Sequence, residues 1–224
     1  MNLTMIRKYF ALISARNRYP VFSIIALLLM ITGCQSGNKT GRESKTASLS
    51  VPAANNDFFQ DIAKEIGLDF VHWIGDNELI NIVQSDGGGA AFLDFDKDGY
   101  IDIYACNGTW IEKFSKSEKP DVLPTNRLYR NLGNGTYEDV TKKAGVGGPW
   151  YTMGVSVADF NNDGYPDIYL SNYGPNVLLK NNGNGKFTDV TKRAGVAGGN
   201  ECSIGATWFD YDNDSYLDFY VGNF

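Results

Sequence analysis

The stretch that decides the fold runs from Gly89 to Asn107 and reads GAAFLDFDKDGYIDIYACN. It recurs twice along the chain, as GVSVADFNNDGYPDIYLSN from Gly154 and as GATWFDYDNDSYLDFYVGN from Gly205. Each copy has a glycine five positions before its first aspartate, a tyrosine ten positions after it and an asparagine thirteen positions after it. The chain therefore contains an internal repeat, whose first aspartates are Asp94, Asp159 and Asp210.

A second block repeats between these copies. The segment NRLYRNLGNGTYEDVTKKAGV at 126–146 matches NVLLKNNGNGKFTDVTKRAGV at 176–196, an offset of 50 residues. Self-similarity at this period, with no helix-length pattern between the blocks, is typical of the blades of a β-propeller. The predicted fold class is therefore all-β, a partial propeller of about three four-stranded blades over residues 57–224.

The pattern within one unit predicts four short strands. We expect them at 90–93, 101–106, 128–130 and 136–140, followed by one helical turn at 141–145 that a glycine ends. In the strand Ile101–Cys106 we expect the isoleucines to face inward and the aspartate and tyrosine to face outward. Phe58–Leu68 matches the last block of a unit whose beginning is absent.

The number of units bears on the length of the protein. Propellers use roughly four to eight blades, more than residues 57–224 supply. The pattern also predicts another Asn-x-Leu-Tyr block after Phe224. We therefore expect this chain to be the N-terminal part of a longer protein.

The aspartate-rich loops carry the candidate chemistry. In each loop, oxygen donors stand at positions 1, 3, 5 and 9, and a backbone carbonyl stands at position 7, so the loop can wrap around one hard cation. A glycine at position 6 permits the sharp turn in two of the loops. The predicted ligands are Asp94, Asp96, Asp98, Tyr100 and Asp102, then Asp159, Asn161, Asp163, Tyr165 and Asp167, then Asp210, Asp212, Asp214, Tyr216 and Asp218.

The donor set indicates the metal. Oxygen ligands without histidine or cysteine suit Ca²⁺ better than Zn²⁺, and Mg²⁺ prefers a tighter octahedron with retained waters. An EF-hand is excluded because it needs a glutamate at position 12, where this chain has Ala105, Leu170 and Val221. The remaining alternative is an ordinary hairpin turn with solvated carboxylates, and three copies in register argue against it.

Electrostatics points the same way. Two carboxylates about 4 Å apart repel each other by roughly 4 kcal/mol at an effective dielectric near 20, so converging carboxylates need a cation. The loops use 11 of the 26 acidic residues and could hold up to three Ca²⁺ ions. The second loop has one carboxylate fewer and the third lacks the glycine, so we expect the first loop to bind best.

These motifs resemble the FG-GAP/VCBS repeat, the calcium-bearing blade of integrin-α N-terminal propellers. The motif Gly67-Leu68-Asp69-Phe70-Val71-His72, the motif Asn126-Arg127-Leu128-Tyr129-Arg130-Asn131 and the Asp-Val-Thr-x-x-Ala-Gly-Val tails resemble the cartilage acidic protein-like family, whose bacterial members often end in an ASPIC/UnbV domain. The resemblance covers about 57–224. It implies a seven-bladed propeller with calcium in the loops between first and second strands, used for extracellular binding or adhesion. Asn161 and Ser215 depart from the motif.

The first 34 residues are predicted to be a targeting segment. A basic leader precedes the eleven-residue apolar run Val21–Ile31, which is too short to span a bilayer as a helix. The run ends in Ile31-Thr32-Gly33-Cys34, which resembles the bacterial lipoprotein signal, so residues 1–33 are the predicted signal peptide and Cys34 the lipidated residue. Gln35 after the cysteine implies the outer membrane of the cell envelope. Residues 34–56 are rich in Ser, Thr, Gly and Lys and are predicted to be a flexible tether.

Charge and composition exclude several classes. The net charge is −6, and from Cys34 onward 16 basic residues face 26 acidic ones, so nucleic acid is not an expected partner. His72 is the one histidine, and no nucleophile motif stands beside it, so we expect a structural role for it and no enzymatic activity. Cys106 and Cys202 could form a disulfide, and the insertion Gly108–Thr125 could carry recognition or tuck its aromatic residues inward.

The sequence therefore predicts a calcium-binding, lipid-anchored propeller that contacts the membrane through its anchor alone and binds a protein or carbohydrate. A propeller enzyme with its catalytic residues elsewhere, or an accessory protein for a membrane partner, are the alternatives.

Overall fold

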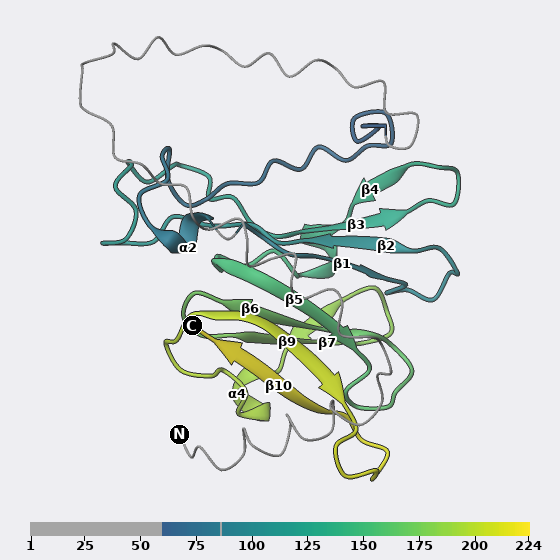
Figure 1. Cartoon of the computed structure of the whole chain (residues 1–224). Coiled ribbons are helices and arrows are strands. Elements are labelled where there is room, and N and C mark those ends of the chain that lie inside the picture. The colour runs from purple at the N-terminus through teal and green to yellow at the C-terminus, as the bar shows by residue number, and fades with distance from the viewer. Residues whose placement is uncertain (1–59, 86) are drawn as a thin grey trace, which may run out of the picture. The chain divides into compact units, whose positions relative to one another are not determined.

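The computed structural model describes residues 60–85 and 87–224, which belong to one compact unit that begins at Asn56. Most of the regular secondary structure of this unit is antiparallel strand, drawn in Figure 1. The predicted signal peptide, the predicted lipidation site Cys34 and the predicted tether lie outside the described residues. Within the described ranges, no helix combines the length and the apolar character needed to cross a bilayer.

The strands form three sheets in which neighbours in sequence are neighbours in space. Blade 1 consists of β1 (Ala90–Leu93), β2 (Asp102–Ala105), β3 (Arg127–Asn131) and β4 (Tyr137–Asp139). Blade 2 consists of β5 (Thr152–Ala158), β6 (Asp167–Asn172), β7 (Val177–Asn181) and β8 (Phe187–Asp189). The third blade comprises β9 (Ser203–Phe209) and β10 (Asp218–Asn223). The all-β fold class of propeller blades is confirmed.

Within residues 60–85 and 87–224, three one-turn helices accompany the strands: α2 (Ile82–Ser85), α3 (Thr141–Ala144) and α4 (Thr191–Ala194). Each of the last two follows the fourth strand of a blade and ends at a glycine in the left-handed region, Gly145 at φ 77° and Gly195 at φ 72°. The helical turn predicted at 141–145 is therefore confirmed.

The repeated glycine marks where neighbouring blades approach most closely. A Cβ atom on Gly89 would lie 3.2 Å from the Cα of Gly154, and a Cβ on Gly154 would lie 2.6 Å from the carbonyl oxygen of Ile204. Real Cβ atoms essentially never come that close to a backbone oxygen. The first strand of each blade therefore packs backbone to backbone on the first strand of the next, which requires a residue without a side chain.

A repeated asparagine joins the same blades by hydrogen bonds. The Nδ2 of Asn126 donates to Oγ1 of Thr152 at 2.9 Å, and the Nδ2 of Asn176 donates to Oγ of Ser203 at 2.9 Å. Both asparagines are buried, so each bond is shielded from water and fixes the distance between two blades.

Apolar side chains fill the spaces between the blades. The cluster between blades 1 and 2 contains buried residues of both, among them Leu128 and Leu170. Between blade 2 and the third blade, the ring of Tyr169 lies 6.2 Å from that of Trp208 and 5.0 Å from that of Phe219. This packing between sheets is the core that the repeated aromatic residues build.

The predicted alternation of the strand Ile101–Cys106 is wrong. Asp102 and Tyr104 are fully buried, whereas Ile101 is 50% exposed. The two polar residues are buried because each has partners: the carboxylate of Asp102 accepts two backbone N–H bonds, and the hydroxyl of Tyr104 donates to the carbonyl oxygen of Val146 at 2.9 Å. A strand covered on both faces does not follow the pattern of a half-exposed strand.

The segment before β1 behaves as the end of a preceding unit. Residues 62–68 form a turn closed by the bond from the Leu68 N–H to the Ala63 carbonyl at 2.8 Å, and Gly67 has φ 86°. This turn lies beside Tyr137 of β4, whose N–H donates to the Ile66 carbonyl at 2.7 Å. The equivalent Gly145 of blade 1 lies beside Phe187 of β8. The described part of Phe58–Leu68 therefore has the predicted place in the repeat.

The insertion Gly108–Thr125 packs on the segment before β1. Its Phe114 points inward: the ring of Phe114 lies 4.9 Å from that of Tyr173. The carboxylate of Asp76 anchors the insertion by accepting the backbone N–H groups of Lys116 and Ser117 at 2.6 and 3.0 Å. Those bonds, that from Lys116 above all, lower the pKa of Asp76.

Candidate metal centre

Each aspartate-rich loop connects the first two strands of a blade: loop 1 (94–102), loop 2 (159–167) and loop 3 (210–218). Neighbouring loops lie side by side (Figure 1). The Nζ of Lys97 in loop 1 lies 4.8 Å from the ring centroid of Tyr165 in loop 2, and the Nδ2 of Asn162 in loop 2 donates to the Ser215 carbonyl in loop 3 at 3.0 Å. The three loops therefore share one edge of the blade array.

The loops have the same backbone shape. Position 6 has a positive φ in all three, 87° at Gly99, 87° at Gly164 and 70° at Ser215. Ser215 thus adopts a conformation that favours glycine, so the departure from the motif in loop 3 is accommodated at a cost in strain.

The first aspartate of each loop closes the loop. The two carboxylate oxygens of Asp94 accept the N–H groups of Asp98 and Gly99 at 3.1 and 3.0 Å. Asp159 and Asp210 make the equivalent bonds in loops 2 and 3. These bonds fold the loop backbone back on itself, so that the side chains at positions 1, 3 and 9 can converge.

The aspartate at position 9 anchors the loop to the sheet. Asp102 accepts the N–H groups of Phe95 at 3.0 Å and Asn131 at 2.8 Å, and Asp167 makes the equivalent pair of bonds. Burial raises the pKa of both carboxyls to about 6 against the opposing effect of these bonds, and the neighbouring carboxylates add to the rise. A nearby divalent cation would favour the charged form and reverse that rise.

Three carboxylates converge in loop 1 and again in loop 3. One oxygen each of Asp94, Asp96 and Asp102 lie within 4.8 Å of one another, and so do those of Asp210, Asp212 and Asp218. Two oxygens bound to one Ca²⁺ at roughly 2.4 Å can be no farther apart than about that distance. The Oδ1 atom of Asp96 is buried and has no hydrogen-bond partner, so loop 1 holds a shielded oxygen that a cation would satisfy.

Loop 2 has an amide where loop 1 has Asp96. The Nδ2 of Asn161 is buried without an acceptor, while its Oδ1 accepts the Asp163 N–H at 3.0 Å. The Asp163 N–H also donates to Asp159 at 3.1 Å. If the side-chain amide of Asn161 were flipped, this N–H would therefore keep a partner, and Oδ1 of Asn161 would take the buried place of Nδ2. The residues present therefore fit a hard cation in loop 2 as well, with one charge fewer.

The aspartate at position 5 faces elsewhere. Its Oδ1 accepts the N–H of the tyrosine at position 7 in every loop, at 3.0 Å for Asp98, 3.1 Å for Asp163 and 2.8 Å for Asp214. Neither Asp98 nor Asp214 belongs to the converging groups. The structure therefore brings positions 1, 3 and 9 together in loops 1 and 3, and in all three loops it turns position 5 toward the backbone of Tyr100, Tyr165 and Tyr216.

Two basic residues that were not predicted from the sequence contact the loops. Arg130 of β3 forms ion pairs with Asp96 at 2.5 Å and Asp98 at 2.7 Å, and Lys180 of β7 pairs with Asp163 at 2.8 Å. The pair with Lys180 lowers the pKa of Asp163. Both residues occupy the same place in the second repeated block, which is the signal that could have identified them.

Other candidate residues lie away from the loops. Cys106 and Cys202 are not joined to each other by a disulfide and belong to different core clusters. Burial raises the pKa of the Cys106 thiol to about 12, which suits a packing role. The ring centroid of His72 lies 6.5 Å from that of Phe70.

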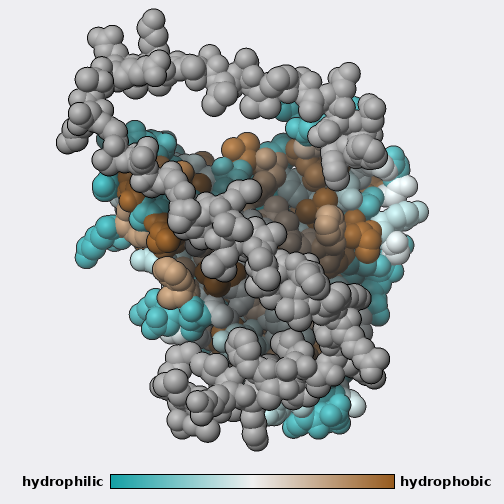
Figure 2. All heavy atoms as spheres, in the orientation of Figure 1, coloured by the Kyte–Doolittle hydropathy of each residue, from teal (hydrophilic) through white to brown (hydrophobic). Residues whose placement is uncertain are grey.

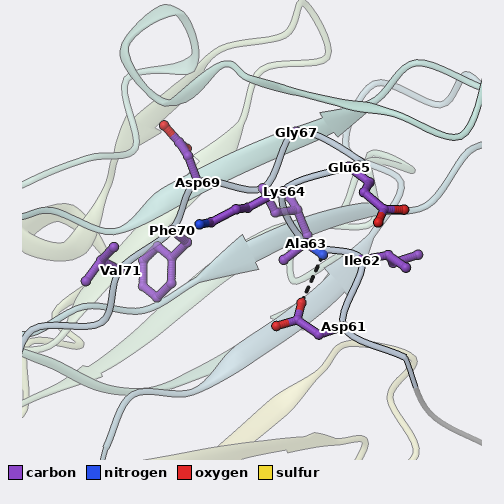
Figure 3. Close-up of a pocket in the computed structure, with 10 residues that line it drawn as sticks. Asp61, Ile62, Ala63, Lys64, Glu65, Gly67, Asp69, Phe70 and Val71 are labelled. Carbon is purple, nitrogen blue, oxygen red and sulfur yellow. Dashed lines mark hydrogen bonds between the residues drawn. The ribbon is translucent and has the colours of Figure 1, made fainter.

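Two surface hollows are separate from the aspartate loops. One, of about 880 Å³, is lined by the segment Asp61–Val71, where Figure 3 shows the carboxylate of Asp61 bonded to the Ala63 N–H. The other, of about 590 Å³, lies where blades 1 and 2 meet and includes Trp150 and Arg127. The tips of the loops are exposed, and Figure 2 shows hydrophilic residues at the end of the third blade that carries loop 3.

The sequence of the chain is similar to that of known repeat proteins. A model of the FG-GAP-like repeat matches residues 94–170 and 159–221, which together span more than half of the 224 residues. Cartilage acidic protein 1 of Mus musculus is 47% identical over 55 residues, and that of Homo sapiens is 46% identical over 55 residues. Each alignment covers 24% of this chain and 8% of the relative. The chain belongs to the FG-GAP-like repeat family.

Proposed function

We propose that this chain is a calcium-binding lipoprotein of the bacterial cell envelope whose blades act as an integrin-like binding and adhesion module. The FG-GAP-like repeats and the antiparallel blades support the module. Its ligand is a protein or a carbohydrate, and its role is binding and not catalysis.

The observation that carries the calcium proposal is the environment of Asp96. Its Oδ1 is buried and has no partner, and the carboxylate belongs to a group of three whose oxygens lie within 4.8 Å. Such an oxygen costs free energy unless something satisfies it, and a hard cation is the partner that oxygen donors prefer. Asp94, Asp96 and Asp102 would hold the ion in loop 1, and Asp210, Asp212 and Asp218 in loop 3. Asp159, Asn161 and Asp167 would do so in loop 2.

The bound ion would supply positive charge at the edge of the blades and nothing more. It would neutralise carboxylates that otherwise repel one another and so hold each loop against its strands. Rigid loops on one edge then form a constant surface for a partner, which is how loops on rigid scaffolds serve recognition.

The location of the protein is proposed from its first 35 residues. The basic leader, the short apolar run and the box that ends at Cys34 support an acyl anchor, and Gln35 supports the outer membrane. Incorporation of labelled palmitate tests the anchor, and a Cys34→Ser variant should abolish the label. Label retained in that variant would reject Cys34 as the lipidated residue.

Thermal unfolding tests the calcium proposal. Millimolar Ca²⁺ should raise the melting temperature above its value in EDTA by about 5 °C or more, since an ion in large excess over its Kd stabilises the folded state by a few kcal/mol. Asp96→Asn should reduce this shift, whereas Asp121→Asn, an exposed aspartate in the insertion, should leave it intact. Equal melting curves in calcium and in EDTA would contradict the proposal.

A further inference from the structure

The third strand of each four-stranded blade carries one basic residue whose side chain contacts the aspartate-rich loop of its own blade. In blade 1 this residue is Arg130 and in blade 2 it is Lys180, and the two stand 50 positions apart, the repeat offset. Neither pair is a chance surface contact, because the same position contacts the same part of the loop in both blades.

The two residues differ in a way that follows the number of carboxylates in the loop. Loop 1 has four carboxylates, and Arg130 contacts two of them, with Nε against Asp96 at 2.5 Å and Nη2 against Asp98 at 2.7 Å. Loop 2 has Asn161 in place of the aspartate at position 3, and Lys180 contacts a single carboxylate there, Asp163 at 2.8 Å. The loop with more carboxylates therefore has the forked cation, whose geometry matches two acceptors.

Arg130 and a bound ion would share Asp96. Its Oδ2 pairs with the guanidinium, while its buried Oδ1 has no partner and belongs to the group with Asp94 and Asp102. An ion held by that group would therefore lie one carboxylate away from a fixed positive charge. Like charges so close repel each other strongly, even at the effective dielectric of a protein surface.

The same ion pairs stabilise the loop when no ion is bound. The guanidinium neutralises part of the carboxylate repulsion, so the four carboxylates of loop 1 taken together with Arg130 carry three net negative charges instead of four. Loop 2 with Lys180 retains two instead of three. In both loops the basic residue thus supplies permanently what a metal ion supplies reversibly.

From these contacts we propose that Arg130 and Lys180 are internal counter-cations that set the calcium affinity of loops 1 and 2. Each stabilises its loop without calcium and weakens the binding of the ion. The inference rests on the proposed calcium binding, and it adds a residue outside the loop that determines how tightly the ion is held. The calcium affinity of a loop therefore depends on a residue of the third strand as well as on the loop motif.

Calcium titration of an Arg130→Met variant tests this role, because methionine keeps an apolar stem and removes the charge. The complete chain carries Asp159→Asn and Asp210→Asn in all samples, so that calorimetry follows loop 1. Arg130→Met should bind Ca²⁺ about tenfold more tightly than the same background with Arg130. Arg127→Met is the matched control, since Arg127 lies on the same strand and pairs with Asp139 at 2.8 Å.

Thermal unfolding of the single variants in the otherwise unchanged chain provides a second readout. Arg130→Met should melt at a lower temperature than the unchanged chain in EDTA, and calcium should raise its melting temperature by more. Lys180→Met should show the same two changes in melting temperature through loop 2. The melting temperature of Arg130→Lys in EDTA should lie between those of Arg130→Met and the unchanged chain.

The outcomes separate the two proposals. Unchanged or weaker calcium binding by Arg130→Met, with normal binding in the Arg127→Met control, would overturn the counter-cation role and show that Arg130 orients Asp96. Calcium binding in none of the samples would instead overturn the calcium proposal, and this inference with it.

Discussion

The side-chain Nδ2 of Asn181, in blade 2, donates a 2.8 Å hydrogen bond to the backbone carbonyl of Phe95, in loop 1 of blade 1. Asn181 is fully buried, and its own N–H donates to Asp167 of loop 2 at 2.7 Å. One buried residue thus connects the backbone of one aspartate loop to a carboxylate of the next. The conformation of the loops and the packing between blades are therefore physically linked.

Asn181→Ala should lower the free energy of unfolding by about 1–3 kcal/mol, because it leaves the Phe95 carbonyl without this buried donor. Asn131→Ala is the matched control: the equivalent Nδ2 donates to the Ile101 carbonyl of its own blade at an exposed site. Denaturant unfolding of both variants measures the difference. Equal losses would show that the bond between blades adds nothing.

Gly154→Ala should destabilise the protein by about 1–3 kcal/mol through overpacking, since the new Cβ would lie 2.6 Å from the Ile204 carbonyl oxygen. Gly205→Ala provides the control, because a Cβ at that equivalent position meets no atom within 4 Å. Melting temperatures of the two variants decide the matter. If Gly154→Ala melts no lower than Gly205→Ala, the close approach of neighbouring first strands is not real.

Ser215→Gly should stabilise loop 3 by about 1 kcal/mol, because Ser215 adopts φ 70° and glycine reaches this region without steric cost. The reverse change in loop 1, Gly99→Ser, should cost a similar amount at φ 87°. Denaturant unfolding under calcium-free conditions isolates the backbone effect. A destabilised Ser215→Gly variant would mean that the serine side chain makes a favourable contact.

Asp102 and Asp167 should titrate near pH 6 in the calcium-free protein, against 3.8 for an ordinary aspartate. Their stabilising contribution is complete below the unfolded pKa and is lost as the pH rises through the folded pKa, so the free energy of unfolding should fall between about pH 4 and 6. Calcium should move both titrations well below 6, because it favours the charged carboxylate.

Carbon-13 NMR of the aspartate carboxyl groups measures these titrations directly. Asp163 is the internal control, since its ion pair with Lys180 lowers its pKa below 3.8. Titrations of Asp102 and Asp167 that stay near 6 in millimolar calcium would argue against an ion at position 9.

The repeat allowed much of the fold to be predicted. Fixed offsets of glycine, tyrosine and asparagine from the first aspartate gave the strand positions, and β1 has the predicted bounds, Ala90–Leu93. The structure shows why the offsets are fixed. The glycine meets the next blade, and the tyrosine Tyr104 bonds to the Val146 carbonyl at the end of its own blade. The converging positions of loops 1 and 3 were likewise readable from spacing.

The parts that escaped prediction depend on contacts between distant segments. Asp102 and Tyr104 are buried because partners in other strands satisfy them, which the sequence of a single strand does not reveal. The basic residues Arg130 and Lys180 follow their loops by 28 and 13 residues, and only the pairing of the strands brings them back to the carboxylates. The position 5 aspartates are an exception, because each accepts the backbone N–H two residues later in its own loop, a local contact that the spacing of the donors does not reveal.

A structure determined from crystals grown in millimolar calcium most directly tests whether the loops are metal sites. We expect anomalous density for one Ca²⁺ among Asp94, Asp96 and Asp102, with Oδ1 of Asp96 among its ligands at roughly 2.3–2.6 Å. Water alone among these three carboxylates, with Asp96 still paired to Arg130, would contradict the central claim that the loops are metal sites.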